Sequence, residues 1–299
     1  MSEARGTVIT VLRGGCEVVS GDRVQRLKLS GKHAKGEIAL AVGDELTFDA
    51  EGGIVHEILP RRTKLARLRS FGKPREQVIA TNADRLAIVV SVASPPFRSG
   101  AVDRFLLAAH VGGLDAVLVE NKVDLLAPGE ALPEEIRVYE VVTELLPVSV
   151  KTGAGLDALR ARLAGSTTVL AGHSGVGKSS LINALEPELR LETAEVSAKW
   201  DRGKHTTTRS VFVRLPGGAI AIDTPGVREI GTGPVDPALL SAVYPDLAGY
   251  AEECRFRDCR HATEPGCGVR AAGSLPASTA ARVESWRRLR EEIEPRRQT

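Results

Sequence analysis

Residues 172–179 read Gly-His-Ser-Gly-Val-Gly-Lys-Ser, and this stretch constrains the fold more than any other. An apolar, β-branched run precedes it at 167–171, and residues 180–185 have the composition of a helix start. A strand, a glycine turn and a helix in that order form the setting of a phosphate-binding P-loop. The glycines let backbone N–H groups turn inward around a phosphate, and the helix N-terminus adds its positive dipole. The sequence therefore predicts an α/β domain with a mostly parallel sheet and a bound nucleotide.

Two side chains of the P-loop have expected roles of their own. We expect the Lys178 ammonium to reach the β- and γ-phosphate oxygens, and the Ser179 hydroxyl to bind Mg²⁺. The other loop residues are expected to contact the nucleotide, mainly through backbone N–H groups. They are Gly172, His173, Ser174, Gly175, Val176, Gly177 and Ser180.

A second motif, Asn121-Lys122-Val123-Asp124, follows a predicted strand at 116–119. Guanine presents two donors on one edge, N1–H and the 2-amino group, and a single carboxylate can accept both. We expect Asp124 to form this pair, for which adenine has no equivalent, and Asn121 to contact the other side of the base. The motif, Val123 included, therefore predicts a guanine site.

A third segment, Ser149-Val150-Lys151, follows another short predicted strand and completes the base site. The N–H of Val150 or of a neighbour is expected to donate to the guanine keto oxygen. The stems of Lys122 and Lys151 are expected to pack over the two faces of the base.

The sequence Asp223-Thr224-Pro225-Gly226 ends a predicted strand and supplies the remaining parts of the site. Asp223 is expected to hold Mg²⁺ through water, and the Gly226 N–H to contact the γ-phosphate. One threonine of 206–208, with Thr207 as the candidate, is expected to close over the metal.

The order of these motifs is unusual. Most GTPases have the P-loop first and the base-reading loops last, whereas here 121–124 and 149–151 precede 172–179. Ligand loops of a parallel sheet lie at the carboxyl ends of the strands in whatever order the chain visits them. We therefore expect one site in a circularly permuted GTPase domain.

The residue that positions the attacking water is not obvious. Many GTPases have a glutamine directly after the Asp-x-x-Gly motif, but this chain has Val227, which has no polar side-chain atom. His205, next to the threonines, is the candidate, and His173 is the second choice. We expect slow intrinsic hydrolysis that a partner accelerates.

The C-terminal segment has the ligand spacing of a metal site: Cys254-x4-Cys259-x-His261-x5-Cys267. Three thiolates and one imidazole suffice for a closed tetrahedral zinc site, and a site without an open position is structural. Cys16 is expected to be a free thiol. A last helix is predicted from Arg282, with Val283, Trp286, Leu289 and Ile293 on one stripe; its arginines form either an RNA contact or a solvated face.

The N-terminal part shows short alternating runs between residues 7 and 59, including one at 38–42, separated by turns. About five short strands suit a small closed barrel such as an OB-fold, with or without an RNA ligand. Residues 61–75 have many basic residues and no acidic one, and are expected to be a linker that is either solvated or in contact with RNA. We therefore predict three domains: 1–62, 63–232 and 233–299.

Composition excludes several classes. The net charge of +2 is too small to mark the whole chain as a nucleic-acid binder, so any such contact must be local. No apolar run is long enough to span a membrane, and the start lacks the apolar core of a signal peptide. We expect a cytoplasmic monomer without a membrane partner.

The sequence resembles the RsgA/YjeQ family of circularly permuted GTPases. The resemblance covers nearly the whole chain: the barrel, 79–84, 121–124, 172–180, 205–208, 223–226 and the Cys/His cluster. It implies an OB-fold, GTPase and zinc-domain architecture, GTP and GDP as ligands, and a role in late maturation of the small ribosomal subunit, with rRNA as partner. It also implies that an apolar residue at Val227 is a family trait, whereas His173 departs from the glutamine that the family leads one to expect.

Two other interpretations remain. In the first, the chain is an RNA-binding module in which GTP is only a conformational ligand. Negligible GTP turnover in the presence of ribosomal subunits would favour this interpretation. Alternatively it is an ATP-using P-loop enzyme, against which Asp124 argues.

Overall fold

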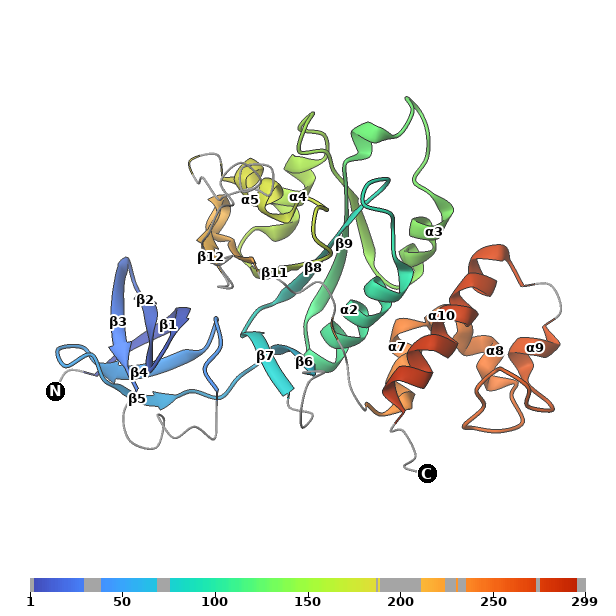
Figure 1. Ribbon diagram of the computed structural model, residues 1–299, viewed down its shortest axis with the longest axis horizontal. Coiled ribbons are helices and arrows are strands. Elements are labelled where there is room, and N and C mark those ends of the chain that lie inside the picture. The colour runs from blue at the N-terminus through green and yellow to red at the C-terminus, as the bar shows by residue number, and fades with distance from the viewer. Residues whose placement is uncertain are drawn as a thin grey trace, which may run out of the picture.

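A computed structural model of the protein describes residues 3–29, 39–68, 76–186, 188, 211–223, 230, 235–272 and 275–294 (Figure 1). The chain forms a β-barrel at its N-terminus, then a central sheet covered by helices, then a group of C-terminal helices. In Figure 1 the barrel and the C-terminal helices lie on opposite sides of the central sheet. Across the described ranges, no helix combines the length and the apolar character that a membrane crossing needs.

The N-terminal part is an antiparallel sheet with the strand order β3-β2-β1-β4-β5. Its strands are β1 (Glu3–Leu12), β2 (Gly15–Ser20), β3 (Arg23–Lys28), β4 (Glu45–Asp49) and β5 (Val55–Ile58). A parallel bridge between Lys28 and Ile54 joins the two edges, so the sheet closes on itself. This closure confirms the predicted barrel of five short strands.

Two segments near the barrel differ from the prediction. Residues 38–42 were expected to form a strand, but the described part of this run, 39–42, is irregular and has a single bridge, from Val42 to Ala80. The Ala41 N–H donates to the Asp44 carboxylate at 2.8 Å, and this turn replaces strand pairing. The apolar character of 39–42 reflects burial of Ala41 and Val42 rather than a strand, and residue 38 lies outside the described residues.

The second difference is in the expected linker at 61–75, which includes strand β6 (Lys64–Leu68). This strand pairs in antiparallel fashion with β7 (Glu76–Thr81). Leu65 points into the core and is fully buried, while the neighbouring Lys64 pairs with Glu76 across the two strands at 2.7 Å. The alternation of buried and exposed side chains is not evident from the basic composition, because only one side of the strand is apolar.

The central sheet has the order β10-β9-β8-β11-β13-β12, with all neighbours parallel except β12 and β13. Its strands are β8 (Arg85–Ser91), β9 (Asp115–Asn121), β10 (Glu144–Pro147), β11 (Thr167–Ala171), β12 (Val211–Arg214) and β13 (Ile220–Asp223). β8 and β9 are buried on both faces, which explains their nearly continuous apolar sequences.

Helices cover both faces of this sheet. On one face lie α2 (Ser99–Gly112), α3 (Glu134–Arg137) and a 3₁₀ turn (Val138–Val141); on the other lie α4 (Leu156–Leu163) and α5 (Lys178–Leu185). Phe105 and Tyr139 pack on the first face, and Leu159 and Leu181 on the second.

The C-terminal helices pack against α2 and share its apolar core. They are α7 (Leu240–Val243), α8 (Ala248–Glu252), α9 (Gly268–Ala271) and α10 (Ala277–Ile293), with short 3₁₀ turns at Pro237–Leu239 and Pro245–Leu247. The predicted stripe of α10 is buried, although the helix begins at Ala277 rather than at Arg282. Arg282 is itself buried, so the expectation that the arginines of this helix face solvent or RNA is wrong for this one. The domain limits at 62 and 232 remain predictions.

Candidate nucleotide site and metal centre

The predicted nucleotide motifs lie at one edge of the central sheet. The segments 121–124, 149–151 and 172–179 follow the carboxyl ends of the parallel strands β9, β10 and β11, and Asp223 ends β13. Parallel strands deliver these ends to the same edge, so loops that are far apart in the sequence meet there. Chain order therefore does not prevent a single site.

Backbone geometry at the P-loop requires glycine. Gly172 has a φ of +143°, and a Cβ there would lie 2.2 Å from the carbonyl oxygen of Val89 on the adjacent strand. The Lys178 Nζ, from the first turn of α5, donates to the carbonyls of Gly172 at 2.8 Å and His173 at 3.1 Å. These bonds hold the ammonium over the loop.

The candidate magnesium ligands from two elements also meet. The Ser179 hydroxyl of α5 donates to the Asp223 carboxylate of β13 at 3.1 Å. A hydroxyl and a carboxylate are hard oxygen ligands of the kind that Mg²⁺ takes, so this pair fits such an ion. Thr207, Gly226 and His205 lie outside the described residues.

Asn121 joins three loops. Its buried side chain donates from Nδ2 to the Val176 carbonyl at 2.8 Å and accepts at Oδ1 from the N–H groups of Lys122 at 2.8 Å and Val150 at 3.4 Å. A Cβ at Gly177 would lie 2.4 Å from this amide, which explains the third glycine of the loop. The base-reading loops are thus bonded to the P-loop itself.

Lys122 makes a contact that sequence reasoning missed. Its backbone is left-handed, with a φ of +67°, and its Nζ donates to the carbonyls of Gly175 at 2.8 Å and Ser94 at 2.6 Å. The segment around Ser94 connects β8 to α2 and carries no nucleotide motif. No feature of the sequence identified it as a neighbour of the P-loop.

The Asp124 carboxylate is held by two neighbours from the β10 loop. The Ser149 hydroxyl donates to Oδ1 at 2.6 Å, and the Lys151 Nζ lies 3.7 Å from Oδ2. The hydrogen bond from Ser149 is the largest cause that lowers the pKa of Asp124, and the Lys151 charge lowers it further. The group is therefore an ionised acceptor at neutral pH, as a bidentate pair with guanine requires.

His173, the second choice for the catalytic role, is half-buried at the P-loop. Its Nδ1 lies 3.0 Å from the carbonyl oxygen of the next residue, Ser174. This is a local contact within the loop.

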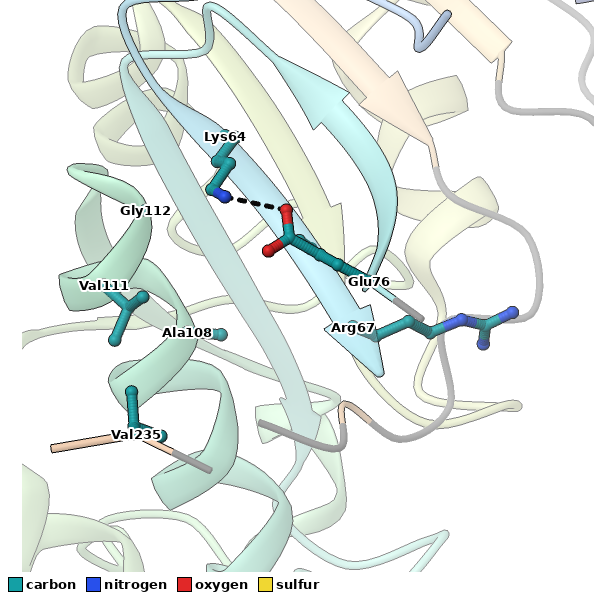
Figure 2. Close-up of a pocket in the computed structure, with 8 residues that line it drawn as sticks. Lys64, Arg67, Glu76, Ala108, Val111, Gly112 and Val235 are labelled. Atoms are coloured by element: carbon teal, nitrogen blue, oxygen red, sulfur yellow. Dashed lines mark hydrogen bonds and ion pairs between the residues drawn. The ribbon is translucent and has the colours of Figure 1, made fainter. Parts of the chain in front are cut away.

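A separate pocket lies between β6 and α2 (Figure 2). Its walls include Val111, Ala108 and Val235 together with the Lys64–Glu76 ion pair. None of the predicted nucleotide residues lines it. We therefore do not assign the nucleotide to this pocket.

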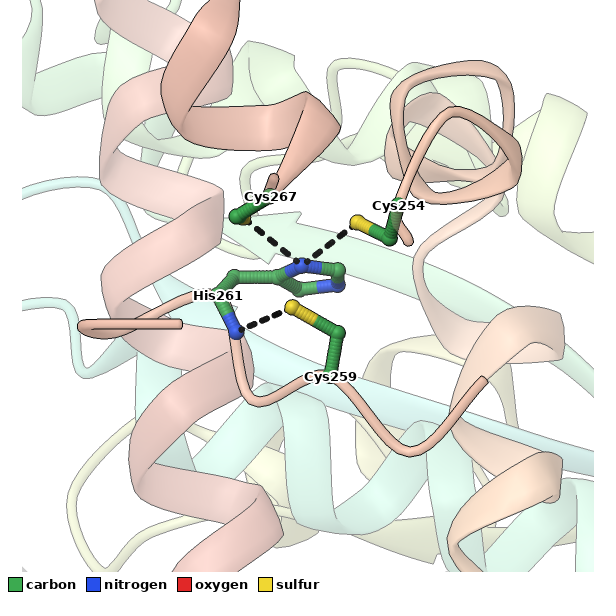
Figure 3. Close-up of side chains that lie close together, drawn as sticks. All are labelled: Cys254, Cys259, His261 and Cys267. Carbon is green, nitrogen blue, oxygen red and sulfur yellow. Dashed lines mark hydrogen bonds between the residues drawn. The ribbon is translucent and has the colours of Figure 1, made fainter. Parts of the chain in front are cut away.

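The four predicted metal ligands come together in the C-terminal part (Figure 3). One ligand atom from each of Cys254, Cys259, His261 and Cys267 lies within 4.8 Å of all the others. The His261 Nδ1 is 3.5 Å from the sulfur atoms of both Cys254 and Cys267. Tetrahedral zinc with bonds of about 2.3 Å separates its sulfur ligands by about 3.8 Å, so the cluster fits such an ion in donor set and size.

Surrounding groups hold these ligands in place. The Gly268 N–H donates to the Cys254 sulfur at 3.2 Å, and the His261 N–H to the Cys259 sulfur at 3.4 Å. The His261 ring packs on Trp286 of α10, with centroids 4.6 Å apart. The outer support therefore links the metal centre to the last helix.

Residues 58–233 match the RsgA GTPase family. The chain is 38% identical to the small ribosomal subunit biogenesis GTPase RsgA of Gemmatimonas aurantiaca, over 88% of this chain and 87% of that protein. It is 37% identical to the protein of the same name from Chlorobaculum parvum, over 98% of this chain and 100% of that one.

Solved structures resemble the whole fold. YjeQ from Thermotoga maritima superposes with a TM-score of 0.73 at 28% sequence identity. The match covers 99% of this chain and 100% of the YjeQ chain. YloQ, described as a circularly permuted GTPase, superposes with a TM-score of 0.66 at 25% identity, over 99% of this chain and 97% of its own. With the permuted order of the nucleotide loops and the Cys₃His cluster, these matches show that the chain belongs to the RsgA family of circularly permuted GTPases.

Proposed function

We propose that this GTPase binds GTP with Mg²⁺ at the edge of the central sheet where the parallel strands have their carboxyl ends. We further propose that it hydrolyses GTP as a factor in maturation of the small ribosomal subunit. The observation that carries the first part is the set of bonds among the loops. Asn121 ties the β9 loop to Val176, Lys122 ties it to Gly175, and Ser179 bonds to Asp223. Three separate segments, the β9 loop, the P-loop and the end of β13, therefore act as one preorganised site.

In this proposal the base is read by Asp124, whose two oxygens accept the N1–H and 2-amino protons of guanine. Ser149 and Lys151 favour the ionised acceptor, because both lower its pKa. The same pair orients the carboxylate, since each contacts a different oxygen.

The phosphates are proposed to lie along the P-loop. Backbone N–H groups of 172–180 and the Lys178 ammonium would bind the β- and γ-phosphates. Ser179 would bind Mg²⁺ directly and Asp223 would hold it through water, with Thr207 as a further ligand and the Gly226 N–H on the γ-phosphate. The ion supplies charge neutralisation on the oxygens of the transferred phosphoryl group.

Water must be oriented for attack without the usual glutamine, because Val227 follows the Asp-x-x-Gly motif. We propose His205 for this role, positioned by the bound partner. Since the partner completes the site, hydrolysis by the chain alone is expected to be slow.

The Cys₃His cluster is proposed to hold one structural zinc ion, since all four ligands are protein groups and no position is open. The partner is proposed from the relatives, which are named as small ribosomal subunit biogenesis GTPases. We therefore expect contact with the small subunit and its rRNA.

The test is GTP turnover with and without purified small ribosomal subunits. We expect a saturable rise of about 10²- to 10³-fold, the worth of one correctly placed transition-state group. Lys178→Ala should abolish both rates. Turnover that does not respond to subunits would contradict the proposed coupling and favour a module in which GTP is only a conformational ligand.

A further inference from the structure

The loop between the first two metal ligands exposes an aromatic ring. It reads Arg255-Phe256-Arg257-Asp258, and the Phe256 side chain is 41% exposed. The other large hydrophobic side chains exposed in the described ranges are aliphatic: Val11, Val24, Ile54, Val111, Leu125 and Val141. Burial of a phenylalanine side chain contributes about 1.5–3 kcal/mol, so an exposed ring on a well-supported loop points to a partner.

This loop is held in one conformation. The Arg255 N–H donates to the Gly266 carbonyl at 2.8 Å, and the Cys259 N–H donates back to the Phe256 carbonyl at 3.2 Å. Both ends of the loop are residues of the Cys₃His cluster. The ring therefore loses little conformational entropy when it binds, which favours a specific contact over an incidental one.

Two of the three charged side chains in this loop are positive. The Arg255 guanidinium lies 5.5 Å from the Phe256 ring centroid, and Arg257 is exposed with no ion pair among the described residues. Asp258 is the one acidic side chain in the loop.

Three other charged residues of this region are already engaged. Arg260 pairs with Glu294 at 2.7 Å, and Arg270 donates to the Glu264 carbonyl at 3.4 Å. The Glu264 carboxylate accepts three backbone N–H groups of its own loop, so its oxygens are already engaged there. The arginines available to a partner are therefore those beside Phe256.

We propose that Phe256 is a stacking platform for an unpaired RNA base, with Arg257 bound to an adjacent phosphate and Arg255 supporting the ring. Aromatic rings flanked by cations hold single-stranded RNA in this way, because every base has a face to stack and each nucleotide has a phosphate. An apolar protein surface fits less well, since it would desolvate two guanidinium groups without pairing them. The inference rests on the proposed function, in which the small subunit supplies the RNA.

The experiment measures binding of the full zinc-loaded chain to a fluorescein-labelled single-stranded RNA oligonucleotide at several salt concentrations. Phe256→Ala should weaken binding by about 5- to 150-fold with an unchanged salt dependence, because stacking carries no charge. Arg257→Ala should reduce the slope of log affinity against log salt by about 0.7, the effect of one phosphate contact on a single strand. Phe256→Trp should retain binding.

Asp258→Asn is the matched control from the same loop, and it should bind as well as or better than the wild type. Zinc content and melting temperature confirm that each variant keeps its fold. The proposal is overturned if Phe256→Ala binds this RNA like the wild type, or if Phe256→Leu binds as well as Phe256→Trp.

Binding to purified small subunits separates RNA from protein as the partner. If Phe256→Ala loses affinity for the subunit but keeps it for the oligonucleotide, the ring contacts protein and the proposal is wrong. Wild-type GTP turnover with subunits tests the proposed function independently. If subunits stimulate wild-type turnover but Phe256→Ala binds RNA as the wild type does, only the proposed stacking platform is refuted.

Discussion

The carboxylate of Asp124 is the side chain on which the choice of nucleotide depends. Its role was predicted from the four-residue motif 121–124, because the two donors on one edge of guanine call for a carboxylate acceptor. Sequence did not show that Ser149 donates to one of its oxygens and that Lys151 lies near the other. Both contacts follow from the pairing of β9 with β10, which places their carboxyl ends side by side.

Replacing Asp124 by asparagine should exchange GTP for xanthosine triphosphate as the preferred substrate. Xanthine has a carbonyl where guanine has the 2-amino group, and an amide can donate to it. We expect GTP affinity to fall by about 10²-fold, since hydrogen bonds to a charged group contribute about 1.5–3 kcal/mol. Competition between the two nucleotides measures the preference, Asp157→Asn on the surface of α4 is the control, and an unchanged preference would refute the base-reading scheme.

At the scale of an element, strand β9 contains one residue that breaks its apolar pattern. Glu120 is fully buried next to Asn121, and its carboxylate oxygens have no hydrogen-bond partner in the described part of the chain. Burial is the main cause that raises the pKa of Glu120 from 4.5 to about 8, and the charge of Glu140 adds to it. The strand that carries the guanine motif therefore contains a neutral carboxylic acid at physiological pH.

This strand should make stability depend on pH. Between pH 4.5 and about 8 the folded state keeps a proton on Glu120 that the unfolded state has lost, so the free energy of unfolding falls as pH rises through this window. At roughly 1.4 kcal/mol per pH unit the total loss over this window is on the order of 5 kcal/mol. Glu120→Gln should remove this component in urea unfolding at pH 5.5 and 8, whereas exposed Glu135→Gln should keep it. Equal pH slopes for wild type and Glu120→Gln would show that the carboxyl is not protonated.

At the scale of the whole molecule, a buried polar cluster joins the C-terminal helices to the central sheet. Arg282 of α10 lies between the rings of Tyr139 and Tyr244, at 5.0 and 4.4 Å from their centroids. It pairs with Asp103 of α2 at 3.4 Å and with Asp246 at 3.2 Å. Arg282 and Asp103 are 2% and 1% exposed, so the pair is fully desolvated.

Removing one partner of this pair should cost more than removing both. Arg282→Met leaves Asp103 buried without its cation and is expected to lower the free energy of unfolding by about 3–5 kcal/mol. The double variant Arg282→Met, Asp103→Leu should recover part of this loss, because no uncompensated charge remains. Urea unfolding of both singles and the double measures the coupling, and additive effects would mean that the ion pair does not hold the helices together.

Particular residues show which contacts could be predicted from the sequence. The four metal ligands were correctly grouped because ligand spacing in a short loop leaves few arrangements. The prediction for Arg282 was wrong. This residue stands four positions before Trp286 and therefore on the same helix face. An arginine is expected to face solvent unless an acidic partner for it in the core is known. That acid, Asp103, is 179 residues away, a separation at which local patterns carry no information.

By itself the sequence determined the chemistry of this protein: glycine turns before a helix, a guanine-type motif, and three cysteines with a histidine. These depend on residue type and short spacing, which local backbone geometry enforces. Only the tertiary structure decided which distant groups meet, such as Lys122 with Ser94, Asn121 with Val176, and Arg282 with Asp103. The reason is physical: sheet order and helix packing bring these groups together, and both arise from burial summed over the whole chain rather than from any one segment.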